Sequence, residues 1–172
     1  PLILQQEGMG LTTWYNDDVI ITGGSRSHLV PPIGYARLMY ILLDRKKFDE
    51  TKDLDQAKQG DIELFVGRDH DLCGLINIKL DTKNRRAGMG RMAVQSLVDT
   101  AKHDFSIVDI KKSAIGFWKK MGCEFYTDRG VPVTDFKKWS GTGVLNGVIR
   151  TGQRLELNQM PGFSKNAGVP SG

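Results

Sequence analysis

The chain is organised around Lys83-Asn84-Arg85-Arg86-Ala87-Gly88-Met89-Gly90-Arg91, a basic turn that carries two glycines. The apolar run Cys73 to Leu80 precedes the turn and predicts a strand, and Met92 to Lys102 follows it with the pattern of an amphipathic helix. A turn that leaves a strand and opens a helix directs several backbone N–H groups to one point, with the positive end of the helix dipole behind them. This geometry predicts a cradle for a phosphate or pyrophosphate group.

The residue types of the turn suit an anionic ligand. Gly88 and Gly90 remove side chains where such a ligand would approach the backbone, and Arg85, Arg86 and Arg91 add positive charge around it. The alternative interpretation is a surface turn with a solvated basic patch. The turn is neither a dinucleotide fingerprint, because no third glycine follows, nor a P-loop, because no Gly-Lys-Ser/Thr closes it.

The N-terminal part of the chain predicts more helix than sheet. Pro1 to Leu11 has little periodicity and is expected to form an arm, whereas Trp14 to Ile21 contains a first strand. Apolar residues recur at helical spacing from Ala36 to Leu43, which predicts an amphipathic helix over Ile33 to Phe48. The charged segment Asp49 to Gln59 predicts a second, more exposed helix.

The middle of the chain predicts a mixed sheet. Asp61 to Gly67 and Cys73 to Asp81 alternate as half-buried strands do, which predicts an antiparallel hairpin. Phe105 to Ile110 predicts a strand after the helix of the glycine turn, and a strand–helix–strand unit implies a right-handed crossover and a parallel pair. Lys112 to Met121 and Cys123 to Thr127 predict a further helix and strand. We expect an α+β (α/β) fold: a mixed, twisted sheet with a central parallel pair and helices on both faces.

The last part of the chain differs in composition. Val131 to Val133 and Val144 to Leu157 both offer short strand runs, and one of the two is expected to supply the final strand of the sheet. Met160 to Gly172 is rich in glycine and has the composition of an unfolded tail. We therefore divide the chain into a single domain, residues 1–150, and a C-terminal glycine-rich arm, residues 151–172.

Charge and composition limit the partners. The chain has 24 Lys and Arg against 20 Asp and Glu, a net charge of +4, which favours anionic ligands without identifying nucleic acid. Aromatic residues are not interleaved with the basic clusters as a base-stacking platform requires, so nucleic-acid binding is not expected. No secretory leader and no apolar run of membrane-spanning length is present, which predicts a soluble cytoplasmic protein without a membrane partner.

Cysteine and histidine give no metal motif. Cys73 and Cys123 are interpreted as buried thiols in a reducing compartment. His70 lies between Asp69 and Asp71 in a polar turn, which offers too few ligands for a metal ion. We expect no metal cofactor.

The turn and its surroundings resemble a known family. Arg85-x-x-Gly88-x-Gly90 is similar to the Arg/Gln-x-x-Gly-x-Gly/Ala signature of the GNAT family of acyl-CoA N-acyltransferases. A helix, a short strand and the segment Ala114 to Tyr126 follow at distances typical of that family. The resemblance covers the middle of the chain, from Ile62 to Tyr126. It implies the GNAT-like fold, in which two parallel strands splay apart and acyl-CoA lies in the gap between them.

The resemblance implies a cofactor site for acetyl-CoA, or another acyl-CoA, as co-substrate. Backbone groups around Ile78 and Leu80 would pair with the pantetheine, and the amides of Arg86 to Arg91 would hold the pyrophosphate. An amine acceptor, either a small amine or a protein amine, would attack the thioester directly. The expected cofactor-binding residues are Ile78, Leu80, Arg85, Arg86, Ala87, Gly88, Met89, Gly90, Arg91 and Trp118.

The catalytic residues depart from the family pattern. The family's usual acid is a tyrosine four residues after the alanine of its motif, but Ala114 plus four is Trp118, and an indole cannot protonate a thiolate. Tyr126 is the nearest phenol in the sequence and is the candidate acid. Glu63, which alternates outward on its strand, and Asp81 are the candidate bases.

Two functions of different class remain open. Lys111 and Cys123 stand where the family motif has asparagine and phenylalanine, so the cofactor half of the site is better preserved than the catalytic half. The first function is an acyl-CoA N-acyltransferase. The alternative is a catalytically degenerate structural or interaction module, such as a virion component of a bacteriophage. That alternative involves a homo-oligomer or a larger protein assembly formed through the termini.

Overall fold

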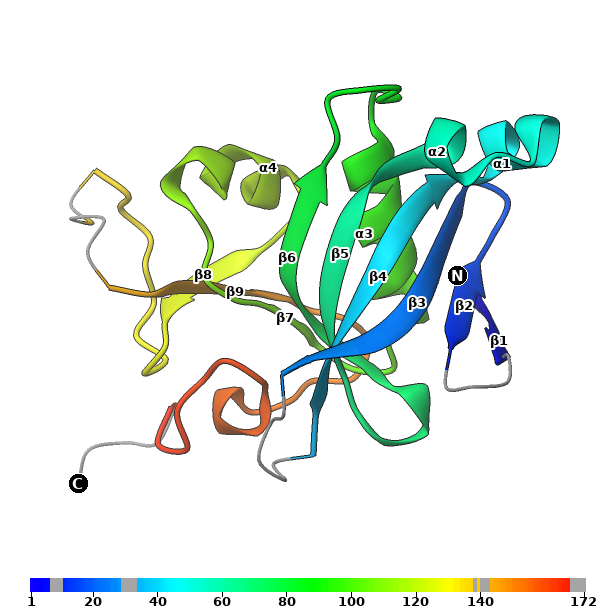
Figure 1. The fold of residues 1–172 in the computed structure, drawn as a ribbon. Coiled ribbons are helices and arrows are strands. Elements are labelled where there is room, and N and C mark those ends of the chain that lie inside the picture. The colour runs from blue at the N-terminus through cyan, green and yellow to red at the C-terminus, as the bar shows by residue number, and fades with distance from the viewer. Residues whose placement is uncertain (7–10, 29–33, 138, 140–142, 168–172) are drawn as a thin grey trace.

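The fold is mixed α+β and is built on one mostly antiparallel sheet. A computed structural model describes residues 1–6, 11–28, 34–137, 139 and 143–167 (Figure 1). Within these residues the sheet has nine strands in the order β1-β2-β3-β4-β5-β6-β7-β9-β8. Neighbouring strands are antiparallel except for β6 and β7, which run parallel.

The elements have the following bounds. The strands are β1 (Ile3–Gln6), β2 (Thr12–Tyr15), β3 (Val19–His28), β4 (Ala36–Asp44), β5 (Lys58–Val66), β6 (Leu72–Leu80), β7 (Phe105–Ile107), β8 (Glu124–Thr127) and β9 (Leu145–Ile149). The helices are α1 (Arg45–Thr51), α2 (Leu54–Ala57), α3 (Met89–Thr100) and α4 (Ile115–Lys120), with the 3-10 turns η2 (Arg68–His70), η3 (Lys112–Ala114) and η4 (Leu157–Gln159). Among the described helices, none has both the length and the apolar character needed to cross a membrane.

Strand β4 replaces the helix predicted over Ile33 to Phe48, so that prediction is wrong (Ile33 itself lies outside the described residues). β4 pairs with β3 on one side and β5 on the other. The apolar residues of this stretch also alternate, because Leu38, Tyr40 and Leu42 all contribute to the core on one face of the strand. Pairing with two neighbouring strands outweighs the helical spacing that the sequence shows locally. Only the end of the predicted helix is helical, as the first turn of α1.

The other N-terminal predictions need smaller corrections. The expected arm contains the edge strand β1, and the expected first strand is two strands, β2 and β3. The side chain of Asn16 makes the turn between them, because its Oδ1 accepts the N–H groups of Asp18 and Val19, each at 2.9 Å. The second predicted helix is reduced to the end of α1 and the four-residue α2, which Asp53 caps.

The predictions for the middle of the chain agree with the structure more closely than those for the N-terminal part. The antiparallel hairpin is confirmed as β5 and β6. The helix after the glycine turn is α3, and the strand that follows is β7, which lies parallel to β6. The predicted helix over Lys112 to Met121 is divided into η3 and α4, and β8 and β9 close the sheet beyond β7.

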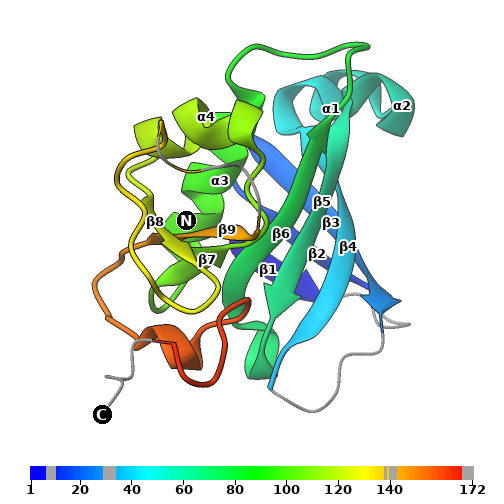
Figure 2. The ribbon, with the colours of Figure 1, turned by 90° about the vertical axis from the view of Figure 1, so that its left-hand side faces the viewer.

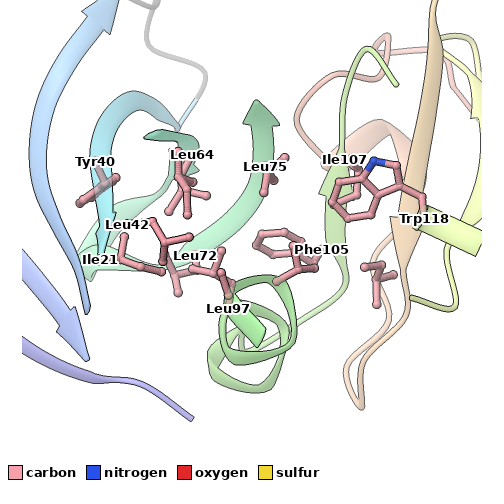
Figure 3. Close-up of a cluster of buried hydrophobic side chains, with 14 of the residues drawn as sticks. Ile21, Tyr40, Leu42, Leu64, Leu72, Leu75, Leu97, Phe105, Ile107 and Trp118 are labelled. Atoms are coloured by element: carbon pink, nitrogen blue, oxygen red, sulfur yellow. The ribbon is translucent and has the colours of Figure 1, made fainter. Parts of the chain in front are cut away.

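One hydrophobic core joins one face of the sheet to α3 and α4. Figure 3 shows Leu42, Leu64 and Leu75 of the central strands beside Leu97 of α3, with Trp118 of α4 pointing toward the end of β7. Trp118 is 4% exposed. Burial of apolar side chains from both layers supplies the main driving force that holds α3 and α4 on the sheet.

The C-terminal segment covers the opposite face of β9. Val148 packs with Leu157, Met160 and Ala167 in a second buried cluster. The prediction of an unfolded tail is therefore wrong as far as Ala167, and residues 168–172 lie outside the described residues. The expected helix is not found over this second cluster: in the described part of the covering segment the one regular element is the 3-10 turn η4.

A buried carboxylate anchors this segment to the sheet. Asp104, which is fully buried, precedes β7 and accepts hydrogen bonds from Arg150 Nη1 at 2.7 Å, Thr151 N at 2.8 Å and Leu155 N at 3.0 Å. Burial alone would raise the pKa of this carboxyl, but the hydrogen bonds from Thr151, Arg150 and Leu155 outweigh burial and lower the pKa below its usual value.

We predict that Asp104→Asn lowers the free energy of unfolding by roughly 2–4 kcal/mol at neutral pH, because it leaves Arg150 without its buried partner. The pKa of Asp104 is lower in the folded state, so its stabilisation is complete above the unfolded pKa of about 3.9 and is lost as pH falls through the folded pKa. Urea unfolding at several pH values should show the gap between wild type and variant closing in acid. The exposed Asp17→Asn serves as control. A gap that stays constant down to low pH would contradict this role.

Candidate functional site

The site lies where β6 and β7 separate. The two strands pair only through Gly74 with Ser106 and Leu75 with Ile107. One more hydrogen bond, from Val108 N to Leu75 O at 3.1 Å, ends the contact. Beyond it, β6 continues to Leu80 and, among the described strands, pairs with β5 only. Figures 1 and 2 show β6 rising away from β7, with α4 standing beside it. We call this arrangement the fork.

A bulge in β6 turns its free edge toward the fork. The register with β5 shifts between Leu75 and Asn77, so Ile76 is an extra residue in β6. Beyond the bulge, Asp81 N–H donates to Gln59 O of β5 at 2.8 Å. Successive residues of a strand direct their backbone groups to opposite edges, so the N–H and C=O of Ile78 and Leu80 point away from β5 and into the fork. These are the two residues that the sequence predicted to pair with a pantetheine arm.

The turn after β6 is held by a buried side chain from β5. Gln59 is 1% exposed. Its Nε2 donates to Asn84 O at 2.8 Å, and its Oε1 accepts the N–H of Arg86 at 2.7 Å. The guanidinium of Arg86 in turn binds Asp44 Oδ1 at 3.2 Å. The Arg86 amide, expected to hold pyrophosphate, is therefore already used inside the protein. Sequence reasoning missed Gln59 because it placed this residue at the end of an exposed helix.

The first turn of α3 is left without a side-chain cap. Its N-cap is Gly88, with φ 79° and ψ 3°, a left-handed conformation that favours glycine. No side chain caps the helix, and no acidic residue lies in its first turn. A Cβ at Gly90 would lie 3.1 Å from Leu80 Cδ1, so the absent side chain also leaves room beside β6. The positive end of the helix dipole therefore faces the fork without a carboxylate to neutralise it.

These parts enclose a pocket of about 390 Å³, which we call the cradle pocket. Its volume falls within the range of small-molecule sites. It combines basic groups with an apolar wall and, among its lining residues, has no carboxylate. The lining residues are Ile78, Leu80, Arg85, Gly88, Gly90, Arg91, Phe117, Lys120 and Met121. This chemistry suits a ligand with both a phosphate group and an apolar arm.

Four of the predicted cofactor residues do not line the cradle pocket. Arg86 is bound to Asp44, and Ala87 is exposed in the turn. Met89, 1% exposed, and Trp118 belong to the hydrophobic core. The pocket instead takes Phe117, whose ring packs edge-on against Trp118 at a centroid distance of 4.9 Å. Lys120, at the end of α4, and the following Met121 complete the wall, and neither was among the predicted cofactor-binding residues.

Tyr126 lies away from the cradle pocket. It belongs to β8, the strand at the far edge of the sheet, and its hydroxyl donates to Glu124 Oε2 at 2.7 Å. Its ring packs against Phe163 of the C-terminal segment. Burial, and then the hydrogen bond to Glu124, raise the pKa of this phenol. The structure therefore does not bring the predicted acid together with the predicted cofactor residues.

A second pocket opens at the fork on the opposite face of the sheet, and we call it the rear pocket. Its volume is about 480 Å³, and its lining residues are Arg37, Phe65, Ile76, Asn77, Val108, Asp109 and Lys111. Glu63 borders it, because its Oε1 binds Arg37 Nη2 at 3.1 Å and its strand position is opposite Asn77. Asp81, the other candidate base, lines neither pocket.

Comparison of the chain with family models, with curated proteins and with solved structures found no match. The chemistry of the site is therefore argued from its own residues.

We predict that Gln59→Leu loosens the turn, because the Asn84 carbonyl and the Arg86 amide lose part-buried hydrogen bonds worth about 0.5–1.5 kcal/mol each. Hydrogen exchange followed by mass spectrometry should show faster exchange in residues 84–91 than in α3 beyond them. The exposed Gln153→Leu is the control. Unchanged exchange in the turn of a folded Gln59→Leu variant would show that the clamp does not position the cradle.

Proposed function

We propose that the protein is an acyl-CoA N-acyltransferase of the GNAT kind. The observation that carries the proposal is the cradle pocket. There the free edge of β6, an uncapped helix N-terminus and basic side chains without an ion pair among the described residues converge. Acyl-CoA has the matching chemistry, because its pyrophosphate is anionic and its pantetheine arm carries amides between apolar methylenes.

The cradle pocket would hold the cofactor in two parts. The backbone amides at the start of α3, with Arg85 and Arg91, would bind the pyrophosphate. The backbone groups of Ile78 and Leu80 would pair with the pantetheine amides as a neighbouring strand does. Phe117 on the facing wall would pack against the methylenes of the arm.

The acceptor amine would enter from the rear pocket. Its nitrogen attacks the thioester carbonyl carbon, the C–S bond breaks, and the acyl group ends on nitrogen. Glu63, at the border of the rear pocket, would take the proton that the amine loses, with Arg37 holding the carboxylate in place. A thiol of ordinary pKa, about 8.5, leaves as a thiolate without a strong acid. The lack of a phenol in both linings therefore does not block the reaction, since water can protonate the thiolate.

The packing of the C-terminal segment weakens the alternative, a structural module of a larger assembly. That alternative expects assembly through the termini. The segment through Ala167 instead packs on its own sheet, through Met160 and the hydrogen bonds to Asp104. One observation still favours the alternative. Trp118, which stands where the family has its usual acid, is buried in the core.

The test is acetyl-CoA binding measured by calorimetry on wild type and on Arg91→Glu. Reversing this exposed charge should weaken binding about tenfold to a hundredfold, because one charge-assisted hydrogen bond is lost and a repulsion is introduced. Arg129→Glu, with the same charge change on an exposed residue outside the cradle pocket, should bind as wild type does. Equal weakening by both variants would indicate only general electrostatic attraction.

Turnover then separates an enzyme from a binding module. Thiol release from acetyl-CoA in the presence of a panel of amines should depend on the amine, and Glu63→Gln should slow it with little change in acetyl-CoA affinity. Binding without amine-dependent release would favour the module. A folded wild-type protein that binds no acetyl-CoA would remove the basis of the acyltransferase proposal.

A further inference from the structure

A cluster outside both pockets combines three different metal-ligating side chains. Asp71 and Cys73 lie at the start of β6, and His103 lies in the segment between α3 and β7. One ligand atom from each lies within 4.8 Å of the others. His103 Nε2 is 2.7 Å from Asp71 Oδ2, and Cys73 Sγ is 3.8 Å from the same oxygen.

The hydrogen bonding of His103 leaves its Nε2 facing an acceptor. Its Nδ1 lies 3.1 Å from the backbone carbonyl oxygen of Asp104, which only accepts, so Nδ1 carries a hydrogen. In the neutral ring Nε2 then has a lone pair, and it points at the Asp71 carboxylate. Either a second proton or a metal cation must lie between the two atoms. A histidine that binds a metal through one nitrogen commonly donates its other N–H to a backbone carbonyl, as His103 does.

The cluster also contains atoms that could bind a metal ion. Asp71 Oδ1 is buried and has no hydrogen-bond partner among the described residues. The thiol of Cys73 is 3% exposed. A metal ion would replace the thiol proton, and binding would release that proton to solvent.

We propose that Asp71, Cys73 and His103 form a binding site for a zinc ion. A thiolate, an imidazole and a carboxylate together suit Zn²⁺, which three protein ligands and one water bind tetrahedrally. Zinc bond lengths place tetrahedral ligand atoms about 3.3–3.7 Å apart. The Sγ to Oδ2 distance of 3.8 Å is already close to this range. The Nε2 to Oδ2 distance of 2.7 Å would have to open by about 0.7 Å, a small side-chain movement.

The ion would stabilise the base of the fork, where β6 and β7 pair. It would connect the start of β6 to the segment that leads into β7, immediately before Gly74 and Ser106 pair. The expected effect is on stability, since a ligand that binds only the folded state raises the free energy of unfolding. The site is independent of acyl-CoA binding and can be tested without it.

The experiment is a cobalt titration of chelator-treated protein, because Co²⁺ replaces Zn²⁺ and a cobalt–thiolate bond gives a near-ultraviolet charge-transfer band. Wild type should show the band with one equivalent of metal, zinc should abolish it by competition, and zinc should raise the unfolding temperature. Cys73→Ser should lose the band, and His103→Gln should weaken binding by at least about tenfold, since even the loss of a supporting residue costs that much. Cys123→Ser and His70→Gln are matched controls that should behave as wild type.

Each outcome decides the proposal. A band that persists in Cys123→Ser, where Cys73 is the only thiol, supports the site even if Cys73→Ser fails to fold. No band in folded wild type would overturn the proposal and leave a hydrogen-bonded His103–Asp71 pair in the cluster. Metal binding that survives Cys73→Ser and His103→Gln unchanged would assign the metal to other residues and would also overturn it.

Discussion

The parting of β6 from β7 is the constraint on which the rest of the site depends. At the base of the fork the two strands are forced close together, because a Cβ at Gly74 would clash with Ser106, whose backbone oxygen would lie only 2.7 Å away. Only glycine allows this approach. Above it, the bulge at Ile76 directs β6 along β5 and away from β7. One edge of a central strand is thereby left without a partner strand in the part of the chain that the structure describes, and its backbone groups there need a ligand or water.

The cradle depends on this geometry through contacts between distant segments. Gln59 of β5 and Asp44 at the end of β4 hold the turn that follows β6, and the turn sets the direction in which α3 begins. Trp118 packs into the core and so places α4 opposite, where Phe117 and Lys120 form the far wall of the cradle pocket. The positive groups are thus positioned by buried polar and apolar contacts, while the groups available to a ligand stay at the surface. Such preorganisation lowers the cost of binding.

Local patterns predicted the elements around the glycine turn but not those whose structure is decided by distant partners. The hairpin of β5 and β6 and helix α3 were predictable because alternation, periodicity and turn chemistry agree there. The segment of Tyr40 fits a helix and a strand equally well, and its two neighbouring strands decide between them. The C-terminal segment packs through widely spaced residues such as Met160, which form no periodic pattern.

In the site, glycines and arginines of the turn were predicted from their motif, whereas Gln59, Phe117 and Lys120 were not among the predicted residues. Their roles come from tertiary contacts that no local spacing records. Tyr126 was predicted because it is near in sequence. It lies on β8 at the edge of the sheet, away from the cradle pocket.

The most direct test of the fork as a cofactor site is to follow backbone amide resonances of the labelled protein by NMR while acetyl-CoA is added. The account predicts that the largest shifts fall on Ile78 and Leu80 of the free β6 edge and on Gly90 and Arg91 at the start of α3. Amides of β1 and β2, at the opposite side of the sheet, should not move. Shifts confined to basic segments away from the fork, or no shifts in a folded sample at high acetyl-CoA concentration, would contradict the account.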